Sequence, residues 1–140
     1  MRYTPEHKIE ARHKIIQAAG ALSKKEGFGT TGVDGLMHAA GMTSGAFYKH
    51  FKGKEQLLED IVSTEIKRSI GLFLSDGGGT EELAAAVQKY LSRSHVNHPD
   101  KGCILPALSA EVGRASSQVK HTFERELMVM IGALETRVKD

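Results

Sequence analysis

Residues 39–58, AAGMTSGAFYKHFKGKEQLL, constrain the fold of this chain more than any other segment. They read as a short helix, a turn at Gly41 and a second short helix that carries aromatic and basic residues. A glycine allows the chain to turn sharply, and Thr43 and Ser44 have side chains suited to capping the helix that follows. Two helices joined in this way lie at a steep angle, as in a helix-turn-helix motif, which leaves the second helix free to enter a major groove.

Apolar residues at helical spacing predict helices along the rest of the chain, and no segment alternates as a strand does. Helices are expected over residues 6–26, 34–40, 44–51, from 54 onward, over 81–94 and 104–112, and after a cap at Ser117, about seven in all. Residues 75–79, with three consecutive glycines, are expected to form a flexible break, and residues 95–102 a polar loop. The predicted fold class is all-α.

Length and composition restrict the setting of the protein. A chain of 140 residues is one domain, or a small domain joined to part of a second. Its single cysteine, Cys103, cannot form an internal disulfide, and the polar N-terminus does not resemble a signal peptide. No window approaches the roughly 20 apolar residues that cross a bilayer. We therefore expect a soluble, cytoplasmic protein with no membrane partner.

Charge is distributed unevenly, although the formal net charge is only +2. Residues 1–54 contain nine Lys or Arg against four Asp or Glu, whereas residues 55–140 contain ten against thirteen. The positive part includes the turn motif. This asymmetry is typical of a surface that binds phosphate, but milder versions occur in helical proteins with no nucleic-acid role.

The first 60 or so residues resemble the DNA-binding domain of the TetR family of bacterial transcriptional regulators. The matching residues are Arg12, Ile15, Ala18, Ala19, Leu22, Gly27, the run 40–51 and the run 54–58. One departure is Gly32, where most relatives carry a Ser or Thr that caps the next helix and touches a phosphate. The following residues, Val33-Asp34-Gly35-Leu36-Met37, resemble a subgroup with the same glycine.

The resemblance implies a helix-turn-helix domain over residues 1–53 and a helical ligand-sensing domain over residues 54–140. It implies that small residues at the start of the second helix approach bases and phosphates, that larger ones anchor phosphates, and that Phe47 and Phe51 point inward. Lys54 is expected to reach a phosphate together with the free N–H groups of its helix. The candidate DNA-binding residues are Thr31, Thr43, Ser44, Gly45, Ala46, Tyr48, Lys49, His50 and Lys54.

Residues 102–112 resemble, less specifically, the opening of the sixth helix in one subgroup of the family, with a Gly-Cys step at Gly102 and Cys103. The resemblance implies a repressor that binds a near-palindromic operator as a homodimer and is released when a small-molecule effector occupies a pocket. The candidate effector residues are Phe73, Cys103, Leu105, Leu108 and Phe123. Family members usually continue with two further dimerisation helices, which this chain is expected to lack. Either the chain is truncated, or it dimerises through the apolar stripe Val119–Val138.

Cys103 raises the alternative of a repressor that responds to thiol oxidation or to electrophiles. A helix N-terminus and the nearby Lys101 both favour a thiolate. Against this role, the neighbours Ile104 and Leu105 are apolar, and no second cysteine is present to resolve an oxidised thiol.

The sequence also bears on three other classes of function besides a transcriptional regulator. A metal site at His95, His98, Asp100 and Cys103 matches no standard zinc spacing, so no metal or cofactor is expected. The chain has no Gly-x-Ser-x-Gly or His-Glu-x-x-His motif and no glycine fingerprint after a strand, so no enzyme is predicted. A helical protein-interaction module remains an alternative because of the C-terminal apolar stripe.

Overall fold

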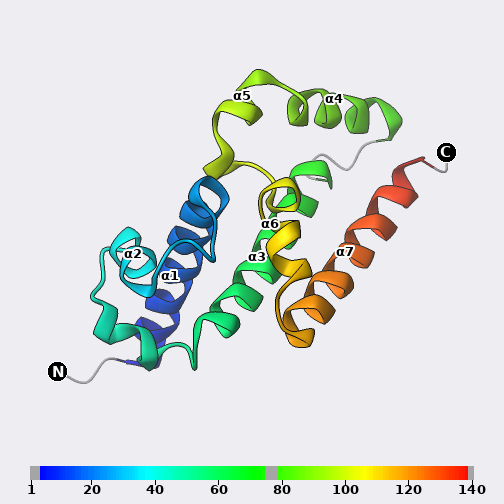
Figure 1. Cartoon of the computed structure of the whole chain (residues 1–140). Coiled ribbons are helices and arrows are strands. Elements are labelled where there is room, and N and C mark those ends of the chain that lie inside the picture. The colour runs from blue at the N-terminus through cyan, green and yellow to red at the C-terminus, as the bar shows by residue number, and fades with distance from the viewer. Residues whose placement is uncertain (1–3, 75–78, 139–140) are drawn as a thin grey trace.

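The computed structural model describes residues 4–74 and 79–138, which form helices and no strand (Figure 1). The elements are α1 (Pro5–Glu26), α2 (Val33–Ala39), the 3₁₀ helix η1 (Ser44–Lys49), α3 (Lys54–Leu74), α4 (Thr80–Tyr90), α5 (Arg93–Asn97), the 3₁₀ helix η2 (Pro99–Lys101), α6 (Ile104–Gly113) and α7 (Ser117–Val138). The all-α prediction is confirmed. Most of the predicted glycine break, residues 75–78, lies outside the described residues.

Helix α1 begins at Pro5, one residue before its predicted start, and ends at Glu26 as predicted. The Thr4 hydroxyl accepts a hydrogen bond from the His7 N–H at 3.3 Å, and Pro5 occupies the first turn, where a missing N–H costs nothing. At the other end Gly27 has φ +90°, and its N–H donates to the Ser23 carbonyl. Left-handed backbone of this kind favours glycine and stops the helix.

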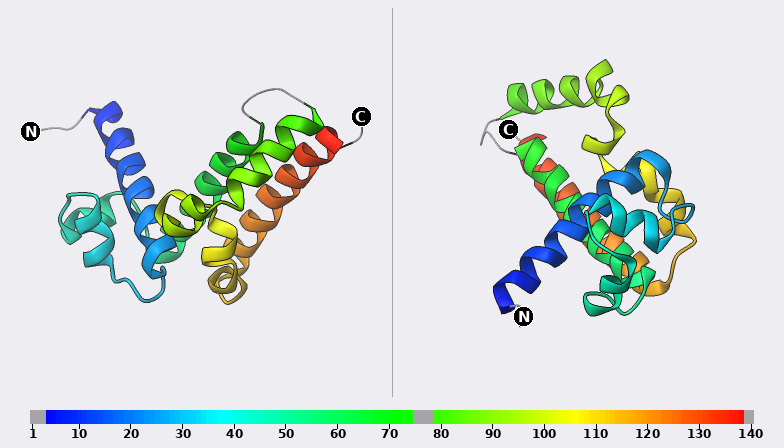
Figure 2. Two further views of the ribbon diagram at one scale, coloured as in Figure 1. Left: turned by 90° about the horizontal axis from the view of Figure 1, so that it is seen from above. Right: turned by 90° about the vertical axis from the view of Figure 1, so that its left-hand side faces the viewer.

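Helices α1, α2 and η1 form one end of the molecule, and α3 leads from them into the second part (Figures 1 and 2). There α3 and α7 lie side by side, while α4 and α5 run above α3 and α6 in the view of Figure 1. One continuous core joins the two parts, with Ile15 and Leu36 at one end and Leu108 and Val119 at the other. The second part therefore packs directly on the first.

The apolar stripe of α7 is mostly covered. Val119 and Met130 are buried, and Phe123, Leu127 and Leu134 pack against the core. The apolar side chains of α7 that remain exposed are Met128, Val129, Ile131 and Val138. No helix of the described residues is long and apolar enough to cross a membrane.

Residues 81–102 differ from the sequence prediction. The helix expected over 81–94 ends at Tyr90, because the Ser92 hydroxyl accepts from the His95 N–H at 3.3 Å and starts a separate helix, α5. The predicted polar loop 95–102 contains the end of α5 and η2, which opens at Pro99. Similarly, it is the Ser116 hydroxyl, one residue before the predicted Ser117, that accepts from the Val119 N–H at the start of α7.

Candidate nucleic-acid interface

The turn between α2 and η1 depends on Gly41, which has φ +70°. The Gly41 N–H donates to the His38 carbonyl at 2.9 Å, and the Met42 N–H donates to the Met37 carbonyl at 3.0 Å. A Cβ added at Gly41 would meet no atom within 4 Å. The backbone conformation, rather than crowding, therefore calls for glycine here.

The helix after the turn is the 3₁₀ helix η1, which is shorter than the helix predicted over residues 44–51. Thr43 occupies the N-cap position, but its side chain makes no capping hydrogen bond. Phe47 is completely buried and stacks on the buried Phe51 with ring centroids 5.4 Å apart, so the predicted inward orientation of both rings is confirmed. The ring of Tyr48 meets Phe47 edge-on, yet Tyr48 is 72% exposed.

Four of the predicted DNA-binding residues in and beside η1 are exposed, namely Thr43, Gly45, Tyr48 and Lys49. Ser44, Ala46 and His50 are half-buried, and Ala46 packs against the core. The exposed set offers a phenol, an ammonium group, a hydroxyl and a bare backbone to a partner. These group types bind phosphate oxygens and base edges in protein–DNA complexes.

His50 lies at the end of η1 among positively charged side chains that affect its pKa. Burial lowers its pKa, and the charges of Lys8, Arg12 and Lys49 lower it further. The imidazole is therefore neutral near pH 7, and it does not supply the charge that the sequence suggested. Its buried Nδ1 has no hydrogen-bond partner among the described residues.

Lys8 and Arg12 are not among the predicted DNA-binding residues, but their charges act on His50 at the end of η1. They lie four residues apart, and hence on one face of α1, which was a readable signal. Arg12 fixes three elements: its guanidinium donates to the His50 carbonyl and to the Asp60 carboxylate of α3, and stands 4.4 Å from the centroid of the Phe51 ring. Arg12 therefore holds the end of η1 in place.

Lys54 has a partner within the protein. Its Nζ donates to the carbonyls of Phe28 at 3.2 Å and Thr31 at 2.7 Å, and lies 4.8 Å from the centroid of the Phe28 ring. The Thr31 hydroxyl in turn donates to the Gly27 carbonyl at 2.8 Å. Two of the three ammonium donors of Lys54 therefore hold the loop between α1 and α2, and one remains for the predicted phosphate contact.

A cavity of about 410 Å³ lies in the second part of the molecule. Its wall comes from α3, α4, α5 and the segment that leads into α6, and includes Phe73, Tyr90, His95 and Cys103. Of the five predicted effector residues, only Phe73 and Cys103 line it. Leu105, Leu108 and Phe123 pack in the core instead, because helical periodicity identifies inward-facing residues without separating a cavity wall from a filled core.

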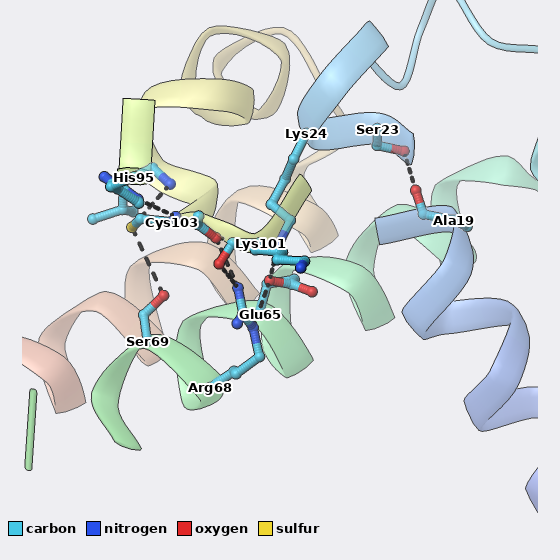
Figure 3. A network of polar contacts seen from close by, with 11 residues as sticks. Ala19, Ser23, Lys24, Glu65, Arg68, Ser69, His95, Lys101 and Cys103 are labelled. Atoms are coloured by element: carbon cyan, nitrogen blue, oxygen red, sulfur yellow. Dashed lines mark hydrogen bonds and ion pairs between the residues drawn. The ribbon is translucent and has the colours of Figure 1, made fainter. Parts of the chain in front are cut away.

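Polar contacts connect this cavity wall to α1 (Figure 3). The buried Lys24 of α1 donates to the Glu65 carboxylate of α3 at 2.8 Å and to the Gly102 carbonyl at 3.1 Å. Arg68, which lines the cavity, donates to the same carboxylate at 3.2 Å and to the same carbonyl at 2.8 Å. A second link joins the two parts, since the Glu111 carboxylate of α6 accepts from the N–H groups of Phe28 and Gly29.

Cys103 and the neighbouring histidines form hydrogen bonds rather than a metal site. The Cys103 N–H donates to His95 Nε2 at 3.1 Å, and its sulfur accepts from the Leu105 N–H at 3.5 Å and the Ser69 hydroxyl at 3.7 Å. His98 Nδ1 lies 2.8 Å from the Ser94 carbonyl. Within residues 4–74 and 79–138, no three His, Cys, Asp or Glu side chains are placed to hold a metal ion.

Residues 15–61, which include the turn motif and the start of α3, match the family model described as bacterial regulatory proteins, tetR family. The chain is similar, over this segment, to the tetR family of bacterial regulatory proteins. It is 34% identical over 59 residues to the HTH-type transcriptional repressor KstR2 of Mycolicibacterium smegmatis, an alignment that covers 42% of this chain and 29% of KstR2. It is 20% identical over 129 residues to the HTH-type transcriptional regulator UidR of Escherichia coli, covering 92% of this chain and 65% of UidR.

Each of these alignments spans less than two thirds of the curated relative, and both relatives are named as regulators of transcription rather than as enzymes. Among solved structures, the reduced form of E. coli NemR superposes with a TM-score of 0.68 at 24% identity, covering 90% of this chain and 69% of NemR. This likeness shows that the fold shared with NemR extends from the turn motif into the second helical part.

Proposed function

We propose that this chain is a sequence-specific DNA-binding repressor of the tetR family that binds a near-palindromic operator as a homodimer. The observation that carries the proposal is the construction of η1. Buried Phe47 fixes it, while Tyr48 and Lys49 project into solvent beside the positive charges of Lys8 and Arg12. Such an element suits docking in a major groove with phosphate contacts around it. The name of the relative KstR2, a transcriptional repressor, supports repression rather than activation.

Dimerisation would use α7. The exposed apolar side chains Met128 and Ile131 lie three residues apart on one face of α7 and offer a surface for a second copy, since an apolar patch on a soluble helix commonly marks an interface. A dimer places two η1 elements at the spacing of successive major grooves, which is what a two-fold symmetric operator requires.

The proposed effector site is the cavity lined by Phe73 and Cys103, and its occupancy would release DNA. Arg68 lies in the cavity wall and shares Glu65 and the Gly102 carbonyl with Lys24 of α1. A ligand that moves Arg68 therefore alters the contacts that position α1 against α3. The proposed boundary between the DNA-binding and sensing parts is at residues 53 and 54, immediately before α3.

Selection of binding sites from a random duplex pool, at near-physiological salt, tests the proposal. The expected result is enrichment of an inverted repeat, which requires both base readout and a dimer. Weak, salt-sensitive binding without enrichment would reject sequence-specific recognition by this chain. Apolar pairing, expected of a protein-interaction module, would be insensitive to salt and would enrich no sequence.

A thiol-responsive repressor is a second candidate, favoured by the position of Cys103 in the cavity wall. Its sulfur accepts hydrogen bonds from the Ser69 hydroxyl and the Leu105 N–H, which fix its position at the wall of the cavity. DNA release by N-ethylmaleimide, lost in Cys103→Ser, is the expected result. Equal release of wild type and variant would reject a role for this thiol.

A further inference from the structure

The side chains that line the cavity carry positive charge, and among these cations only Arg68 is paired with a carboxylate of the described residues, that of Glu65. Arg68, Lys89 and Lys101 line the cavity, and no Asp or Glu among the described residues does. Arg68 uses its Nε and Nη2 for Glu65, Gly102 and the Lys101 carbonyl, which leaves the two N–H groups of Nη1. Lys89 and Lys101 form no ion pair with any carboxylate in residues 4–74 or 79–138. An anion entering the cavity would therefore meet cations that are still available.

The same cavity has a row of rings along its wall. Phe73 and Tyr90 have centroids 5.6 Å apart, and Tyr90 and His95 have centroids 4.5 Å apart, with interplanar angles of 37° and 39°. Burial, followed by the charge of the neighbouring Cys103 and a hydrogen bond with it, raises the pKa of Tyr90, so its hydroxyl stays protonated. The wall as a whole is mostly apolar. A flat apolar body suits such a surface because rings stack favourably on one another.

His95 is fixed in one orientation within this row. Its Nε2 accepts from the Cys103 N–H, so the neutral ring carries its proton on Nδ1. The close approach depends on Gly102, since a Cβ added there would lie 2.7 Å from Nε2. The His95 ring is therefore held in place before any ligand enters, which lowers the entropic cost of ordering it on binding.

We infer that the cavity binds a small aromatic carboxylate, with its ring against Phe73, Tyr90 and His95 and its charge beside Arg68, Lys89 and Lys101. This inference rests on the proposed function, because it names the chemical class of the effector. A volume of about 410 Å³ lies at the lower end of the usual range for small-molecule sites, which favours a compact molecule.

The positive charges of Arg68, Lys89 and Lys101 distinguish an aromatic carboxylate from other molecules of the same shape. A neutral aromatic molecule would fill the same space but make no use of the charges of Lys89 and Lys101 or of the free N–H groups of Arg68. An aromatic cation would be repelled by all three groups. The carboxylate gains charge-assisted hydrogen bonds that the other two cannot form.

Three molecules with one ring system test the inference: 2-naphthoate, 2-naphthylmethanol and 2-naphthylmethylammonium. Each is titrated calorimetrically into the full chain without DNA. We expect 2-naphthoate to bind at least about tenfold more tightly than the alcohol, the scale of one charge-assisted hydrogen bond, and the ammonium compound not to bind. Equal binding of carboxylate and alcohol, or no binding of the carboxylate, overturns the inference.

Variants assign the preference to the cavity. The double variant Lys89→Gln with Lys101→Gln should lose most of the preference for carboxylate and keep its affinity for the alcohol. Lys52→Gln with Lys120→Gln makes the same change of charge at exposed residues outside the cavity, and should behave as wild type. A preference that survives in the first pair, or disappears in the second, overturns the assignment.

Binding of these preparations to the selected duplex separates the two proposals. A chain that binds the inverted repeat, but shows no preference for the carboxylate, retains the proposed function and refutes the ligand class. A chain that prefers the carboxylate but binds no DNA supports the ligand class and refutes the proposed repressor.

Discussion

Gly41 is the residue on which the turn motif depends. Its φ of +70° places it in left-handed backbone, which costs an L-residue with a side chain roughly 1–2 kcal/mol. We therefore expect Gly41→Ala to lower the free energy of unfolding by about that amount, measured by urea denaturation. Space is not the reason, because nothing lies within 4 Å of the added Cβ.

Gly45 provides the matched control for this change. It also has open space around an added Cβ, but its φ is not positive. Gly45→Ala should leave the stability unchanged or raise it slightly, since alanine restricts the unfolded chain. Equal losses at the two glycines would contradict the role assigned to the backbone at Gly41.

His50 is expected to make stability depend on pH. Burial, then Lys8, Arg12 and Lys49, lower its pKa in the folded state below the ordinary value of 6.5. Between these two pKa values the unfolded state binds more protons, so stability falls as pH falls below about 6.5. In denaturation between pH 7.5 and 5, wild type should lose more stability than His50→Gln.

The exposed His13 of α1 serves as the control, because His13→Gln removes a histidine without touching this site. It should reproduce the pH profile of wild type. Parallel profiles for wild type and His50→Gln would show that the folded protein does not discriminate against the imidazolium at residue 50.

At the scale of elements, the contact between α1 and α3 depends on Lys24. Its ammonium group is buried with the Glu65 carboxylate, so removing one partner leaves the other charge buried and less compensated. We expect Lys24→Met to lower the free energy of unfolding by about 3 kcal/mol, the lower end for breaking a buried pair, because Arg68 still contacts Glu65. Lys25→Met, at the exposed neighbour, should have almost no effect. Similar values for the two lysines would contradict a buried pair.

The elements also show what the sequence could and could not predict. Helix α1 was predictable because Thr4, Pro5 and Gly27 act locally on the backbone. The break at Ser92 was not, since its hydroxyl competes with a helix that periodicity alone would continue. Similarly, Lys54 has the charge of a phosphate anchor, but its contacts with the Phe28 and Thr31 carbonyls arise only when distant segments come together.

The candidate sites follow the same distinction. Exposure of Tyr48 and Lys49 and burial of Phe47 follow from a local motif, and could be read from it. The cavity could not, because its wall combines residues from four segments, and Leu105 and Leu108 are equally apolar but fill the core. Only the three-dimensional structure shows that Lys89 and Lys101 form no ion pair with a carboxylate of the described residues.

For the whole molecule, we propose that DNA binds at one end and the ligand at the other. Helix α3 runs from the first part of the molecule into the second (Figure 2). Hydrogen bonds among Lys24, Glu65 and Arg68 connect the two ends. A second connection is the Glu111 carboxylate of α6, which accepts from N–H groups of the loop between α1 and α2. Lys8, Arg12 and Lys49 bring positive charge to the place where α1 and η1 meet. The proposed function depends on η1 being the element that docks on DNA.

The most direct test is the salt dependence of DNA binding by wild type and by Lys49→Gln, on one selected duplex and on a scrambled duplex. The account predicts weaker binding of the variant to both duplexes, and a slope of log K against log salt that is flatter by about one for each subunit bound. Lys120→Gln, an exposed lysine of α7, should match wild type. An unchanged affinity and slope for Lys49→Gln would contradict docking through η1.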